Sequence, residues 1–170
     1  MQFASFDFLL FFVLVLTITW SFGRKRTVRN ITLLLASYFF YYQISSQALA
    51  LLLTSTLLNY AFGNSIVAAT SRTRRWFLYI GIGFNLGFLG LFKYLNFFRS
   101  STEGIAHFFG LEAHIPLLEV VLPIGISFYT FQALTYLIDL YKGHGVLAKS
   151  VLDFALYQAF FTQLLIGPIC

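Results

Sequence analysis

Residues 3–29, FASFDFLLFFVLVLTITWSFGRKRTVR, decide the class of fold, because an apolar run is followed at once by a basic cluster. The apolar part, residues 3–22, holds one acid, Asp7, and has about the 20 residues that a helix needs to cross a hydrocarbon core of roughly 30 Å. A secretory signal peptide carries its positive residues before the apolar run, and no small-residue cleavage site follows Phe22. We therefore predict an uncleaved membrane anchor with its N-terminus outside.

The composition of the whole chain is that of an integral membrane protein. Of 170 residues, 59% are hydrophobic, 20% are aromatic and 10% are charged, and the mean hydropathy is +0.81. Soluble domains carry about 25% charged residues, so soluble globular and disordered classes are excluded. The one cysteine, Cys170, cannot form an internal disulfide, and no Cys/His cluster has zinc spacing. The sequence therefore indicates no metal site.

Five further apolar runs follow the first one. They cover residues 31–44, 48–69, 76–98, 115–141 and 151–169. We predict an all-α, polytopic bundle of about six transmembrane helices, in which the second and third runs form a helical hairpin. The polar gap at residues 99–114 predicts a short helix on the membrane surface. Four glycines are spaced for close helix packing: Gly81, Gly83, Gly87 and Gly90.

The basic residues indicate which side of the membrane each loop faces. Loops 23–30, 70–75 and 142–150 hold nine of the 11 Lys and Arg residues, and all three loops fall on one side of the predicted bundle. By the positive-inside rule this side is cytoplasmic, so both termini are predicted outside. The net charge of +5 then reflects topology, and nucleic acid is not an expected partner.

Residues 122–141, LPIGISFYTFQALTYLIDLY, form the most unusual segment. Four polar side chains recur in it at spacings of three, four and three residues: Tyr129, Gln132, Tyr136 and Asp139. These spacings place them on one helix face, which we call the polar stripe. Because polar groups against lipid are unfavourable by several kcal/mol, the stripe is expected to face protein or a water-filled cavity. One alternative stays open: Asp139 pairs with Lys142, and the tyrosines merely hydrogen-bond to neighbouring helices.

Other ionisable residues give weaker signals. Lys93 interrupts the fourth apolar run near its far end, where a lysine usually extends its ammonium to the interface. His107, His114 and His144 fall in predicted loops and have no Ser, Asp or Cys partner at a suggestive spacing. The residues alone therefore predict a helical membrane protein with a polar stripe, and they indicate no particular activity.

Several blocks of sequence, in order along the chain, point to a known family. They are ASYFFYY at 36–42, Asn59-Tyr60 with Gly63, FKYLNFF at 92–98, LPIGISFYTFQALTYLIDLYKG at 122–143 and FFTQLLIGPI at 160–169. With the Phe-rich anchor, these blocks make the chain resemble the N-terminal half of the membrane-bound O-acyltransferase family. The resemblance is to the bacterial branch that includes the alginate O-acetyltransferase and the teichoic acid D-alanyl transfer proteins.

This resemblance implies an enzyme of the inner (cytoplasmic) membrane that transfers an acyl group, most simply acetyl, to hydroxyls of an extracellular polysaccharide through a tunnel. The implied donor is a thioester such as acetyl-CoA or an acyl carrier, with no bound cofactor. The polar stripe would line the tunnel. The family's catalytic histidine lies in the later half of its chain and matches no histidine here, so the resemblance assigns no catalytic residue. The implied partners are membrane lipid, a C-terminal half or partner acyltransferase proteins, and the polysaccharide acceptor.

Two departures from the family pattern bear on domain organisation. Thr162 stands where the family has proline, and the sequence stops at Cys170 where the family continues with a basic residue. We therefore expect residues 1–170 to be the N-terminal part of one acyltransferase domain, truncated at Cys170 and inactive alone. Two alternatives remain: a non-catalytic membrane subunit or split half that needs a partner, and, less favoured, a small transporter.

Overall fold

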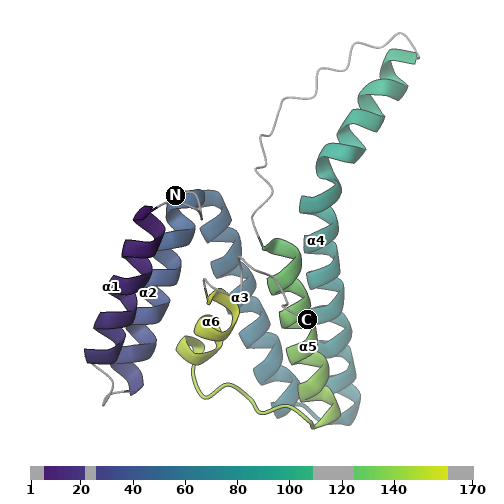
Figure 1. The fold of residues 1–170 in the computed structure, drawn as a ribbon. Helices are drawn as coiled ribbons and strands as arrows, with labels where there is room; N and C mark the ends of the chain where they lie inside the picture. The colour runs from purple at the N-terminus through teal and green to yellow at the C-terminus, as the bar shows by residue number, and fades with distance from the viewer. Residues whose placement is uncertain (1–5, 22–25, 109–124, 161–170) are drawn as a thin grey trace.

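The computed structural model describes residues 6–21, 26–108 and 125–160, and in these ranges the regular secondary structure is all α-helix with no strand. The helices are α1 (Phe6–Ser21), α2 (Arg26–Ile44), α3 (Ser46–Ala68), α4 (Ser71–Phe108), α5 (Ile126–Lys142) and α6 (Val151–Ala159). Figure 1 shows α3 in the middle of the bundle and α4 reaching far beyond the other helices. The all-α prediction is confirmed.

Two of these helices are long and apolar enough to cross a membrane. They are α3 and the first part of α4, Ser71–Phe92, while the apolar segment of α1, Leu10–Ser21, is shorter. The predicted runs 115–141 and 151–169 are described only as α5 and α6, and their other residues lie outside the described ranges. Six spans are therefore not confirmed, although the apolar helices support a membrane protein.

The predicted hairpin of the second and third runs is present as α2 and α3. Ser45 separates the two helices in an extended conformation, and its hydroxyl oxygen accepts a hydrogen bond from the Ala48 N–H at 3.4 Å. Such a cap satisfies one of the free N–H groups at the start of α3. Helix α2 begins at Arg26, five residues before the apolar run, and so gains the length that residues 31–44 lack.

Helix α4 corrects the sequence prediction. A span ending at residue 98 and a separate surface helix were expected, but α4 is continuous over 38 residues and passes through Arg99. The physical reason is that residues 99–108, RSSTEGIAHF, contain no proline and only one glycine, so polarity alone does not end the helix. The remaining residues of the predicted surface segment lie outside the described ranges.

The core consists of two apolar clusters along α3 and α5. The first joins Tyr41 of α2, Leu52 of α3 and Tyr129 of α5. The second joins Ile66 of α3 to Leu137 of α5 and extends to α4. Both clusters use α3 and α5, and α3 packs against α2, α4, α5 and α6, whereas α1 packs mainly against α2.

Close packing of α4 through glycine is confirmed at only one of the four predicted positions. A Cβ atom at Gly81 would lie 2.7 Å from Cδ1 of Leu137, so α4 and α5 approach closely there. Gly83, Gly87 and Gly90 have no atom within 4 Å of the corresponding position in the described structure. The prediction is not confirmed for these three, because the glycine spacing alone does not reveal which face of α4 meets a neighbour.

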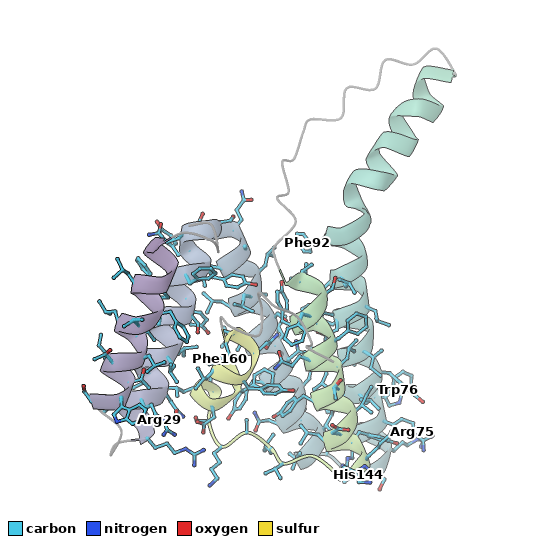
Figure 2. The ribbon with its side chains drawn as sticks, viewed as in Figure 1. Arg29, Arg75, Trp76, Phe92, His144 and Phe160 are labelled. Atoms are coloured by element: carbon cyan, nitrogen blue, oxygen red, sulfur yellow. The ribbon has the colours of Figure 1, made fainter. Side chains whose placement is uncertain are left out.

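The three basic segments lie at one end of the bundle, as predicted. Figure 2 shows Arg29, Arg75 and His144 at this end and Phe92 at the other. The amide of Asn30 donates to Oδ1 of Asp153 at 3.0 Å, which ties the start of α2 to the start of α6. We call this the basic end; its cytoplasmic location stays a prediction.

Arg74 joins two further segments at the basic end. Its Nη2 donates to the Leu140 carbonyl at 2.6 Å, and its guanidinium carbon lies 5.4 Å from the centre of the Tyr141 ring. We expect Arg74→Met to lower the free energy of unfolding by about 1 kcal/mol, because methionine keeps the apolar stem but makes neither interaction. Thermal unfolding in detergent measures the change. Arg72→Met, at an exposed position two residues before Arg74, is the control and is expected to change stability little.

Candidate functional site

A polar network lies inside the apolar bundle. Its side chains come from α3, α4 and α6 and are almost completely buried: Ser55, Asn59, Asn85 and Gln158. Polar groups buried in this way are unfavourable unless they are hydrogen-bonded, so their partners determine whether the network is structural or has free bonding capacity.

The two asparagines form a reciprocal pair between α3 and α4. The Asn59 amide donates to Oδ1 of Asn85 at 3.1 Å, and the Asn85 amide donates to Oδ1 of Asn59 at 2.6 Å. Each amide also donates within its own helix, Asn59 to the Ser55 carbonyl at 2.9 Å and Asn85 to the Gly81 carbonyl at 2.8 Å. All donors and both carbonyl oxygens of the pair are therefore occupied, and its role is to hold α3 and α4 together.

Gln158 extends the network to α6 and leaves one group unpaired. Its amide nitrogen donates to the Ser55 hydroxyl at 2.9 Å, whereas its carbonyl oxygen has no hydrogen-bond partner in the described part of the chain. A buried amide oxygen accepts readily from a hydroxyl or from water. Gln158 is therefore an acceptor site inside the bundle.

The first half of the polar stripe shows similar unpaired atoms. Tyr129 is 0% exposed, and neither its hydroxyl nor that of the neighbouring Thr130 has a partner among the described residues. The amide of Gln132 donates to the Tyr157 carbonyl of α6 at 2.8 Å, but its own carbonyl oxygen is buried and unpaired. These atoms keep the capacity to form hydrogen bonds with water or with a ligand.

Tyr136, in the second half of the stripe, is held by protein. Its hydroxyl accepts from the Ala148 N–H at 3.3 Å, and its ring centre lies 4.7 Å from that of Phe154. The backbone carbonyl oxygen of Asp139 accepts from the N–H groups of His144 and Gly145 at 3.0 Å each, which closes the turn after α5.

The structure decides part of the alternative reading of the stripe. No ion pair joins Asp139 to Lys142 in the described chain, so that part of the alternative is not confirmed. Gln132 and Tyr136 both contact α6, which places this face of α5 against protein. A tunnel wall formed by Tyr129, Gln132, Tyr136 and Asp139 stays a prediction.

The sequence reasoning missed three members of the buried network: Ser55, Asn85 and Gln158. Each lies within an apolar run, as Gln132 does, so a polar residue inside a predicted span was the available signal. Asn59 entered the sequence analysis only as part of a block that resembles the acyltransferase family. Spacing along the chain could not pair these residues, because Gln158 and Ser55 are 103 positions apart.

Comparison with known proteins gives relatives along most of the chain. It is 40% identical over 172 residues to a protein of Pseudomonas aeruginosa and 45% identical over 144 residues to one of Pseudomonas putida, both named "Probable alginate O-acetylase". It is 32% identical over 162 residues to the "Peptidoglycan O-acetyltransferase" of Helicobacter pylori.

The matches cover most of this chain but only about a third of each relative. They cover 99%, 83% and 81% of this chain, but the chain spans only 32%, 29% and 30% of the three relatives, in the same order. No family model matches the chain. No solved structure matches it either.

Proposed function

Because this chain is homologous to alginate O-acetylases, in the bacterial branch of the membrane-bound O-acyltransferases, we propose that it is part of an O-acetyltransferase for a cell-envelope polysaccharide. The observation that carries the proposal is the 40% identity over 99% of the chain to the Pseudomonas aeruginosa protein. The relatives are named for two different glycans, alginate and peptidoglycan, so the common element is transfer of acetyl to a glycan hydroxyl.

The proposed reaction begins with a thioester donor such as acetyl-CoA or an acyl carrier. The hydroxyl oxygen of the glycan attacks the acyl carbon, the carbon–sulfur bond breaks, and the hydroxyl proton passes through a base to the departing thiolate. We assign no residue of this chain to the base. The contribution that we propose for this chain is to position the substrates. The unpaired oxygens of Tyr129, Gln132 and Gln158 would form hydrogen bonds with a substrate that passes between α5 and its neighbours.

The proposed setting is the cytoplasmic membrane, which the chain crosses several times. The basic end faces the cytoplasm in this arrangement, where the thioester donor is made, and the far end faces the acceptor polysaccharide. The proposed partners are membrane lipid, the acceptor, and a further acyltransferase segment or partner protein that provides the base.

The test is transfer of labelled acetyl groups in membranes that contain the protein together with its acyltransferase partner. We expect Gln132→Leu to lower transfer about tenfold, which corresponds to the loss of about 1.4 kcal/mol of transition-state stabilisation. Gln43→Leu is the matched control, because Gln43 is exposed at the end of α2, and it is expected to retain full transfer.

Two results would count against the proposed function, and a third against the role of Gln132. Absence of transfer by the unsubstituted protein with its partner, while the chain remains folded in the membrane, would indicate another function. Transfer that is unchanged on omission of this chain would make it a non-catalytic subunit. Equal loss in both glutamine variants would remove the assignment of Gln132 to the path.

A further inference from the structure

An apolar groove lies between α1 and α2, and Phe160, which directly follows α6, also lines it. Its volume is about 420 Å³, within the range of small-molecule sites. Phe12, Val15, Leu16 and Leu33 form its apolar wall, and Trp20 and Arg29 lie at its basic end. The groove is therefore apolar along most of its length and carries a cation at one end.

A second, more polar hollow continues from this groove. It has a volume of about 480 Å³, and Arg29 and Phe160 line both spaces, so the two are contiguous. The polar hollow adds Arg26, Asn30 and Asp153. Figure 2 shows Arg29 where α2 begins, beside the last turn of α1.

The charges in the polar hollow leave a net positive site. Asp153 is the acid that lines it, and its Oδ1 accepts a hydrogen bond from the Asn30 amide at 3.0 Å. Arg26 and Arg29 are both exposed, and neither has an ion-pair partner in the described ranges. Two guanidinium groups against one carboxylate therefore favour an anion, and a guanidinium binds phosphate through paired N–H donors.

We propose that these contiguous spaces bind an anionic glycerophospholipid of the phosphatidylglycerol class. Its phosphate contacts Arg29, with Arg26 nearby, and one acyl chain lies along Phe12, Val15 and Leu16. Trp20, which is 82% exposed, lies at the boundary between headgroup and acyl chain, where tryptophan is enriched in membrane proteins. Basic pockets between membrane helices on the cytoplasmic side favour anionic headgroups. This site is independent of the proposed acetyl transfer.

Trp20 provides a direct measurement of lipid at the groove. The chain has two tryptophans, so Trp76→Phe leaves Trp20 as the one fluorophore of its kind. The full chain with this change is reconstituted in phosphatidylcholine vesicles that contain either brominated phosphatidylglycerol or brominated phosphatidylcholine. Bromine quenches tryptophan on contact, and the two quenching curves give the relative affinity of the site for the two headgroups.

We expect about a fivefold preference for phosphatidylglycerol, the effect of about one basic residue near an anionic lipid. Arg29→Gln is expected to reduce the preference to nearly one. The matched control is Arg72→Gln, which removes the same charge from an exposed position on α4, away from the groove, and is expected to keep the preference.

Three outcomes would overturn the assignment. Equal quenching by both lipids would show no headgroup selectivity, as expected if a protein segment covers the groove. A preference that survives Arg29→Gln would place the lipid elsewhere. Loss of preference in Arg72→Gln as well would show a general attraction of the basic end to anionic membranes. An unchanged Trp20 emission maximum without brominated lipid checks that each variant is folded.

Discussion

Replacement of Gly63 by leucine is expected to lower the free energy of unfolding by about 1–3 kcal/mol. A Cβ atom at this position in α3 would lie 2.8 Å from Cε1 of Tyr136 and 3.1 Å from Cδ1 of Leu140, both on α5. Either the two helices separate or the Tyr136 ring rotates, and that ring is packed against Phe154 of α6. Thermal unfolding in detergent, followed by tryptophan fluorescence, measures the loss.

Gly87→Leu controls for the chemistry of the substitution itself. Gly87 is also in the middle of a helix, but it is exposed and has no atom within 4 Å of its Cβ direction in the described structure. Leucine is a better helix former than glycine, so stability is expected to hold or rise slightly. An equal loss in both variants would contradict the close contact of α3 with α5.

Substitution of Asn59 by leucine is expected to lower the free energy of unfolding by about 1–2 kcal/mol, because it leaves Oδ1 of the buried Asn85 without its donor. The double variant Asn59→Leu/Asn85→Leu is expected to be more stable than the sum of the single effects predicts. In the double variant no asparagine oxygen of the pair is left without a donor, whereas each single variant leaves one. A double-mutant cycle by thermal unfolding in detergent gives the coupling energy.

Asn64→Leu is the control for the loss of an asparagine from α3. The Asn64 amide donates only within its own helix, to the Tyr60 carbonyl at 2.9 Å, and no bond to another helix is recorded for it in the described chain. We expect a change of less than about 0.5 kcal/mol. Strict additivity of the two leucine substitutions would show that the Asn59–Asn85 pair does not couple α3 to α4.

The sequence predicted the helices where apolar runs are bounded by strong signals. The serine between α2 and α3 is such a signal, and the structure uses it as a cap. The sequence-based prediction failed at the end of α4, since the polar residues from Arg99 to Glu103 are compatible with a helix. Hydropathy marks where a helix leaves an apolar solvent, which is a different position from where its backbone hydrogen bonds end.

The sequence predicted which residues of the candidate site share a helix face, but it did not predict their hydrogen-bond partners. The 3.6-residue period placed Gln132 and Tyr136 on one face of α5, and both do contact α6. Their hydrogen-bond partners, Tyr157 and Ala148, lie 25 and 12 residues further along the chain, and no local pattern predicts such pairings. Asn85 and Gln158 were missed for the same reason, because the role of a buried amide can be assigned only when its hydrogen-bond partner is known.

The unbroken length of α4 has a mechanical consequence. A helix of 38 residues is about 57 Å long, nearly twice the roughly 30 Å of a hydrocarbon core. With Ser71–Phe92 within the bilayer, residues 93–108 extend about 24 Å beyond it, away from the basic end. A displacement of the far end of α4 is carried along one continuous helix to Arg74 and its hydrogen bond with the Leu140 carbonyl. Helix α4 thus couples its far end mechanically to α5 at the basic end.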